Sequence, residues 1–311
     1  MTWKRLSLTL LTALAAWLPA EAALAKVRVV ATLPDLACVA REVGGDTVEV
    51  TALAYPTQDP HFVDARPHLV LALNRADMLV LTGLELETGW LPTLITGSRN
   101  ARIQPGGPGG LTGYFDASTV VPLKQVPQLR IDRSMGDIHP GGNPHYMTDP
   151  RNGALVAVAL AERLAALDPT HREAYRLRAA ALKRSLDAFA KAEARRFAAL
   201  PAKRRQVVVY HQSLIYLLEW LGLQQVSTLE PKPGIPPAPG HVATVLGQMR
   251  ALGVEAILQE DYWPTSVGQL LATKTGARLV TLPGGPGFEQ GESYSRYVGE
   301  LADRVYKGLK P

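Results

Sequence analysis

The sequence has 311 residues, of which 47% are hydrophobic and 20% are charged, and its formal net charge is +5. This length is sufficient for two α/β lobes or one large domain, with a sizeable buried core. Because the positive charge is not concentrated in a basic stretch, we expect no nucleic-acid partner.

The first 25 residues predict a cleavable export signal. Lys4 and Arg5 form a positive start, an apolar stretch covers residues 6–18, and Ala23–Ala25 supplies small residues for cleavage. The apolar stretch is shorter than the ~20 residues that a membrane-spanning helix needs. No Cys follows the small residues, so we expect a secreted, periplasmic protein that is not a lipoprotein and whose mature chain begins near Lys26.

The single Cys of the sequence, Cys38, excludes a disulfide within the chain. Its apolar neighbours predict a small buried thiol in a helix. An exported chain without disulfides must be stabilised by its hydrophobic core.

Residues 26–150 predict an N-terminal α/β lobe. Short β-branched runs alternate there with amphipathic stretches, as in the βαβ units of a parallel sheet. In chain order, these segments are Val27–Ala31, Leu36–Val43, Val48–Thr51, Pro67–Arg75 and Met78–Leu81. Residues Ala101–Pro140 are rich in Gly and Pro, and we expect them to form a loop-rich return.

Residues 151–200 predict a helical region. Pro150–Leu167 and Pro169–Leu200 are rich in Ala, Leu, Arg and Glu and contain few helix breakers. At ~1.5 Å per residue, the second helix would reach ~45 Å. We expect it to run beside both lobes as a stiff connecting spine.

Residues 201–311 predict a second parallel α/β lobe. The expected strands and helices are Val207–Tyr210, Leu214–Leu221, Val226–Leu229, Val242–Leu252, Ala256–Leu258, Ser266–Thr275 and Leu279–Thr281. The two lobes share no convincing residue-level repeat, so we expect similarity in architecture only.

Three of the seven His stand where an α/β fold places ligands, just beyond strand ends or at a helix start. His61 follows Asp59-Pro60 in a turn-like segment, and His145 precedes the predicted helical region. His211 directly follows the strand Val207–Tyr210. Neutral imidazoles suit zinc, copper, iron and nickel, and three imidazoles with one oxygen form a common zinc shell.

The other His have weaker signals. His139 is near His145 in sequence and could approach the same metal, although a role in a turn is the preferred interpretation. We expect His68 and His171 to lie at the surface and His241 to have a structural role at a helix start.

The segments Asp59–Phe62, Gly142–His145 and Tyr210–Ser213 resemble, in order and spacing, the periplasmic zinc- and manganese-binding proteins of ABC transporters (the cluster A-I solute-binding family). The resemblance covers essentially the whole mature chain, including the long midchain helix and Glu230–Gly240. It implies two α/β lobes joined by a rigid helix, with the metal in the cleft between them.

The resemblance also implies the first three ligands, His61, His145 and His211. A His at the third position is typical of zinc-type members, whereas Glu is frequent in manganese-type members. We therefore expect Zn²⁺ as the bound ion, with Mn²⁺ as the alternative.

The fourth position departs from the family pattern. Many members carry an Asp in the loop after the last strand, but residues 282–290 contain none. Glu260, at the end of a predicted strand, is the preferred substitute, as a direct ligand or as a group that orients an imidazole. Glu289 and a water molecule are the alternatives.

These features predict a monomeric binding protein, not an enzyme, that delivers its ion to an ABC membrane permease. A metallochaperone that loads the ion is a further candidate partner. Two other classes also stay open: a haem, siderophore or cobalamin binding protein, and a secreted zinc hydrolase with Glu260 as general base. An aromatic content of 6% argues against the first, and the lack of a His-Glu-x-x-His helix argues against the second.

Overall fold

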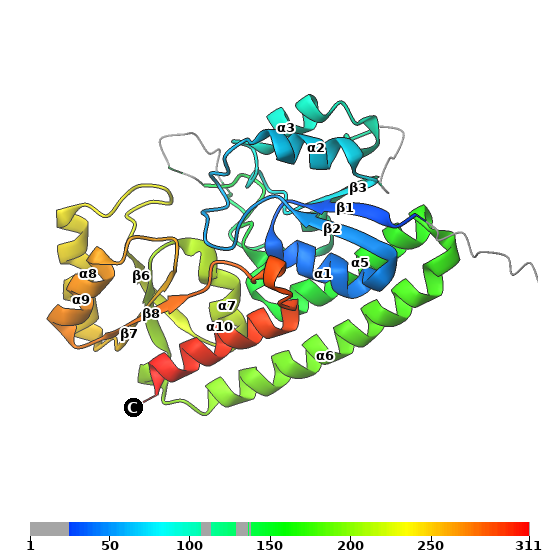
Figure 1. Cartoon of the computed structure of the whole chain (residues 1–311). Coiled ribbons are helices and arrows are strands. Elements are labelled where there is room, and N and C mark those ends of the chain that lie inside the picture. Colours follow the sequence, from blue (N-terminus) through cyan, green and yellow to red (C-terminus); the bar gives the residue numbers. More distant parts are fainter. Residues whose placement is uncertain (1–24, 107–112, 129–135, 137, 311) are drawn as a thin grey trace, which may run out of the picture.

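The computed structural model describes residues 25–106, 113–128, 136 and 138–310. The chain forms two α/β lobes, each with a four-stranded parallel sheet, linked by two long helices (Figure 1). The expected fold class is therefore confirmed. The predicted export signal lies outside the described residues apart from Ala25.

Along the chain, the elements of the first lobe come first, then the two linking helices, then the elements of the second lobe. The first sheet contains β1 Val27–Ala31, β2 Val48–Ala52, β3 Met78–Leu81 and β4 Tyr114–Asp116, with helices α1 Pro34–Gly44, α2 Pro67–Arg75 and α3 Leu91–Ser98. The linking helices are α5 Pro150–Leu167 and α6 Arg172–Ala198. The second sheet contains β5 Gln206–Val209, β6 Gln224–Thr228, β7 Ala256–Glu260 and β8 Arg278–Leu282, with helices α7 Ile215–Leu221, α8 Pro239–Leu252, α9 Ser266–Thr275 and α10 Tyr294–Leu309.

The two sheets have the same topology. Their strand orders are β2-β1-β3-β4 and β6-β5-β7-β8, and all pairings are parallel. Strands β3 and β7 are buried along their whole length, as expected for central strands covered on both faces. In this topology, the crevice beyond the carboxyl ends of neighbouring strands is the usual ligand position.

The structure corrects the sequence-based expectation in three places. Residues Tyr114–Asp116 form the edge strand β4 inside the segment expected to be loop-rich. Helices α3 and α10 were not among the predicted elements. A three-residue strand is too short to give a clear alternation of apolar and polar residues, whereas α10 has a readable apolar face at helical spacing.

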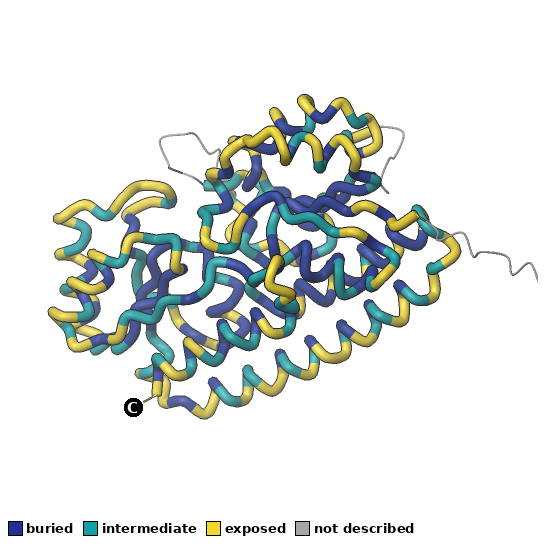
Figure 2. The backbone as a smooth tube through the Cα atoms, viewed as in Figure 1, coloured by how far each residue is buried: buried dark blue, intermediate teal, exposed yellow. Residues whose placement is uncertain are grey.

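A single apolar cluster extends through both lobes. It joins side chains of α1 and β1 in the first lobe to side chains of β5, α7 and α10 in the second, by way of α5 and α6. The buried backbone in Figure 2 follows this cluster across the centre of the molecule. Smaller clusters cover the outer face of each sheet, beneath α2 and α3 in one lobe and beneath α8 and α9 in the other.

Helix α6 is the expected spine. Its 27 residues correspond to ~40 Å at ~1.5 Å per residue, and it runs beside both lobes (Figure 1). Its buried residues, which include Tyr175, Leu182 and Phe197, recur at helical spacing, so one stripe contacts the core. Within the part of the chain that is described, no helix has the length and apolarity needed to span a membrane.

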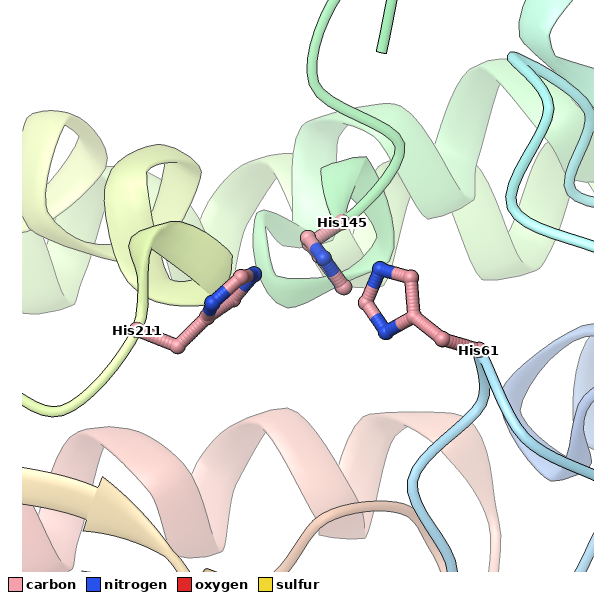
Figure 3. A group of neighbouring side chains, drawn as sticks. All are labelled: His61, His145 and His211. Atoms are coloured by element: carbon pink, nitrogen blue, oxygen red, sulfur yellow. The ribbon is translucent and has the colours of Figure 1, made fainter. Parts of the chain in front are cut away.

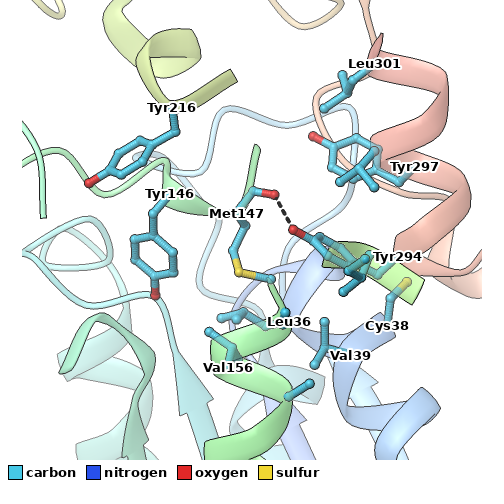
Figure 4. Close-up of a cluster of buried hydrophobic side chains, with 14 of the residues drawn as sticks. Leu36, Cys38, Val39, Tyr146, Met147, Val156, Tyr216, Tyr294, Tyr297 and Leu301 are labelled. Atoms are coloured by element: carbon cyan, nitrogen blue, oxygen red, sulfur yellow. Dashed lines mark hydrogen bonds between the residues drawn. The ribbon is translucent and has the colours of Figure 1, made fainter. Parts of the chain in front are cut away.

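Helix α10 reaches back to the first lobe through Tyr294. Its buried hydroxyl donates to the carbonyl oxygens of Met147 (2.8 Å) and Asp149 (3.2 Å), as Figure 4 shows for Met147. The ring lies against Gly153 of α5, where an added Cβ would stand 2.1 Å from Tyr294 Cε1. This close approach couples the second lobe to the segment just after His145.

We expect Gly153→Ala to destabilise the protein by about 1–3 kcal/mol, because the methyl group overpacks the contact between α5 and Tyr294. Gly247→Ala in α8 is the matched control, since its added Cβ meets nothing within 4 Å and helix propensity favours Ala. Chemical denaturation of both variants measures the effect. Equal stability of the two variants would contradict the proposed tight contact.

Candidate metal centre

Three of the predicted ligands converge between the lobes. One ring nitrogen from each of His61, His145 and His211 lies within 4.8 Å of the other two. The ring centroids are 5.3 Å apart for His61 and His145, 5.7 Å for His61 and His211, and 5.6 Å for His145 and His211. Figure 3 shows the three rings pointing toward one another from three separate segments.

His61 is presented by the loop that follows β2. Asp59 Oδ1 accepts hydrogen bonds from the backbone N–H of His61 at 3.0 Å and from its ring Nδ1 at 2.7 Å. The buried indole of Trp90 donates to the Pro60 carbonyl at 3.0 Å, which anchors the loop. Burial raises the pKa of Asp59, but the hydrogen bonds and charge of His61 outweigh it, so the pKa is lowered overall.

His145 lies in a segment that the second lobe holds in place. The Asn143 side chain accepts from the backbone N–H of His145 at 3.0 Å and donates to the Gln212 carbonyl at 2.9 Å. Tyr216 of α7 donates to the Asn143 carbonyl at 3.0 Å. The pKa of His145 is lowered well below its usual range by burial, with the neighbouring imidazoles adding to the effect.

His211 directly follows β5, as the sequence predicts, and its ring is buried. Its Nδ1 is 2.6 Å from Glu230 Oε2, a buried carboxylate just beyond β6. The same oxygen accepts from the backbone N–H of Gly234 at 3.2 Å. The pairing with Glu230 fixes the imidazole plane.

These contacts leave one nitrogen of each ring facing the centre. Carboxylates only accept hydrogen bonds, so the Nδ1 atoms of His61 and His211 carry the protons and their Nε2 lone pairs are free. His145 Nε2 is buried and has no hydrogen-bond partner. Metal-binding His usually donate their second nitrogen in this way, and an unpaired buried nitrogen is costly without a ligand.

His139 lies beside His61, although the sequence favoured a role in a turn. Its Nε2 lies 3.2 Å from His61 Nε2, and the two rings stack with centroids 5.3 Å apart. Its Nδ1 is 2.9 Å from the Leu84 carbonyl oxygen. Burial, together with the charge of His61, lowers the pKa of His139 to about 4.

Glu260 is buried at the carboxyl end of β7, but it is not part of the group of three His. Its Oε1 accepts from the Ser213 hydroxyl, whereas its Oε2 is buried without a hydrogen bond of normal geometry. It lines an interlobe cavity together with His145. Burial raises its pKa. Glu289, the other acidic candidate, is exposed.

The remaining His lie away from this group. His68 is exposed on α2, and His171 Nδ1 pairs with Asp168 Oδ2 at 2.6 Å. His241 Nε2 donates to the Thr228 carbonyl at 2.9 Å, which is the expected structural role. Cys38 is buried in α1, as predicted, and its thiol donates to the Glu292 carbonyl at 3.0 Å.

Sequence reasoning missed the carboxylates that orient the rings. Asp59 lies two residues before His61, so its local pairing was readable from the sequence. Glu230 meets His211 across the ends of two strands, and only the paired register of β5 and β6 places them together.

Two parallel-sheet lobes joined by long helices, with a donor group between the lobes, define a two-lobed solute-binding protein. Residues 29–308 match the sequence model of the ZnuA family, described as the periplasmic component A of the zinc-uptake complex. The chain belongs to this family, which confirms the resemblance seen in the sequence.

Individual relatives agree over nearly the whole chain. The manganese ABC transporter substrate-binding lipoprotein PsaA of Streptococcus pneumoniae is 24% identical over 291 residues, 91% of this chain and 89% of PsaA. A crystal structure of ZnuA superposes with a TM-score of 0.75 at 22% identity, covering 92% of this chain and all of that one. FpvC of Pseudomonas aeruginosa in complex with Mn²⁺ gives a TM-score of 0.73 at 24% identity, covering 91% and 98%.

We expect Glu230→Gln to weaken zinc binding about 10–100-fold, because the amide oxygen still accepts from Nδ1 of His211 but the negative charge behind the imidazole is lost. Competition with a chromophoric chelator measures the affinity. Glu162→Gln is the control, since Glu162 is an exposed carboxylate on α5 paired with Arg176. Unchanged affinity in the Glu230 variant would exclude this role.

Proposed function

We propose that this protein captures Zn²⁺ outside the cytoplasm and delivers it to an ABC membrane permease, with His61, His145 and His211 as metal ligands. The observation that carries the proposal is the convergence of these three side chains from three segments on one point between the lobes. Pairing of Nδ1 with carboxylates leaves the Nε2 atoms of His61 and His211 unprotonated and ready to bind.

The surrounding charge supports a divalent ion. Asp59 and Glu230 lie directly behind two of the imidazoles, each within hydrogen-bonding distance of a ring nitrogen. Two carboxylates balance the charge of one dication, and a buried charge is tolerated only when it is compensated. The imidazoles themselves bring no charge.

Zinc is preferred over manganese because of the donor type. Nitrogen donors suit zinc, whereas manganese prefers oxygen donors. The family is named for zinc uptake, but PsaA is named as a manganese transporter protein and the FpvC structure is a complex with Mn²⁺. Mn²⁺ is therefore the alternative cargo. Glu260 is retained as a candidate fourth ligand, because its buried Oε2 lacks a hydrogen bond of normal geometry.

A binding role also fits the chemistry of the site better than catalysis. Four protein ligands would close the coordination shell of zinc, and a closed shell reserves no position for a substrate or an activated water molecule. We therefore propose that the chain is not an enzyme and that the bound ion is its cargo.

We further propose export through the N-terminal signal without a lipid anchor, to the periplasm. PsaA is a lipoprotein by name, but the only Cys of this sequence, Cys38, is buried in α1 and unsuited to acylation. The membrane permease is the proposed partner, and a metallochaperone is a second candidate for loading. We expect the protein to act as a monomer.

Each of the variants His61→Ala, His145→Ala and His211→Ala should lose stoichiometric zinc, because one of three converging nitrogens is removed. Mass spectrometry of metal content after stripping and competitive reloading with zinc and manganese measures this. We expect one zinc in the unaltered chain and in the control His241→Ala. Retention of zinc after removal of all three His would contradict the proposal.

Zinc affinity should fall as the pH is lowered from about 7.5 to about 4, because protons compete with zinc for imidazole nitrogens. The pKa of His139 is lowered to about 4 and that of His145 also lies well below its usual range, so both rings stay neutral near pH 7. Protonation of His139 should steepen the loss near pH 4. Chelator competition across this range provides the test, and a constant affinity would be incompatible with ligation by His.

A further inference from the structure

Residues 282–290 contain no Asp that could complete the set of three predicted ligands, but a fourth imidazole stands beside them. His139 Nε2 lies 3.2 Å from His61 Nε2. We propose that His139 is the fourth ligand and that the cargo is held by four imidazole nitrogens. This inference rests on the proposed capture of zinc by His61, His145 and His211.

The proton positions on His61 and His139 support this assignment. The Leu84 carbonyl can only accept a hydrogen bond, so the Nδ1 of His139 is the donor, as Nδ1 of His61 is toward Asp59. In the neutral rings, both Nε2 atoms then carry bare lone pairs that face each other. Only a proton or a metal ion between them makes this arrangement favourable.

The separation of these two nitrogens fits a shared zinc ion. Zn–N bonds of about 2.0–2.1 Å at tetrahedral angles place neighbouring nitrogens about 3.3–3.4 Å apart. The observed distance of 3.2 Å between the Nε2 atoms is close to this edge length.

The first lobe anchors the Nδ1 of His139 at the Leu84 carbonyl oxygen. Leu84 and Glu85 adopt consecutive left-handed conformations, with φ of 55° and 66°, in the loop that offers the Leu84 carbonyl. Such backbone strain persists where the surroundings enforce it, and it is frequent at ligand sites. The buried Glu87 carboxyl accepts from the backbone N–H groups of Thr82 (2.7 Å) and Gly83 (3.1 Å) and so fixes this loop.

The segment that carries His139 packs closely on the same loop. At Gly141, an added Cβ would stand 2.8 Å from Leu84 Cδ2, so a larger residue there would require the end of the Leu84 side chain to shift. His139 is outside the group whose nitrogens all lie within 4.8 Å of one another, so its ring must turn toward His145 and His211 when the ion binds. Side-chain rotation of this kind is common on binding.

Glu260 is the less suitable fourth ligand. Its Oε1 is already engaged by the Ser213 hydroxyl, and burial favours its neutral form. His139 instead faces His61 directly and has its second nitrogen paired with a carbonyl oxygen. A shell of four nitrogens also defines the cargo class, since it favours zinc and other ions that prefer nitrogen and selects against manganese.

X-ray absorption at the zinc edge tests the proposal on the full mature chain loaded with one equivalent of zinc. We expect scattering from four imidazoles in the unaltered protein and from three imidazoles with one oxygen in His139→Ala and His139→Gln. The amide of Gln can still form a hydrogen bond with His61. If His139 only positioned His61, the Gln variant would therefore keep the same zinc ligands as the unaltered protein. His68→Ala, an exposed His on α2, should leave the count at four.

A second measurement compares metals. We expect His139→Asp to lower the ratio of zinc affinity to manganese affinity at least about 10-fold, because an oxygen donor replaces a nitrogen. The proposal would be overturned if zinc in the unaltered protein were bound by three imidazoles and one oxygen, and if His139→Gln left this set of ligands unchanged. Loss of that oxygen in Glu260→Gln would then assign the fourth position to Glu260. If the unaltered protein took up no zinc, the proposed function itself would fail.

Discussion

The apolar cluster that α1, α5, α6, α7 and α10 bury between the two sheets holds both lobes in one fixed relation. The proposed metal site, made from loops of both lobes, depends on this packing, because displacement by about 1 Å is enough to separate ligands from an ion. Tyr216 and Tyr294 extend it by bonding to the backbone on either side of His145. The core therefore prepares the site before the ion arrives.

Within that frame, the polar groups behind the imidazoles decide what the site can bind. Asp59 and Glu230 fix which nitrogen of each ring is free and supply the charge that balances a dication. His61 and His145 come from the first half of the chain and His211 from the second, so the three imidazoles bring the two lobes together at one point.

Much of this arrangement could be predicted from the sequence. Most strands and most helices follow from short β-branched runs and amphipathic stretches, and the candidate positions of His61 and His211 follow from a turn after Pro60 and from the end of a strand. The position of His139 could not, because its approach to His61 depends on packing against Leu84, 55 residues earlier in the chain. Helix α10 was missed although its apolar face, from Tyr294 to Leu309, is visible in the sequence.

Anomalous diffraction at the zinc edge from crystals of the mature chain loaded with one equivalent of zinc would test the central claim most directly. We predict one strong peak between the lobes, about 2.0–2.1 Å from the Nε2 atoms of His61, His145 and His211. A peak elsewhere on the molecule, or crystals without a zinc peak after loading, would contradict the account.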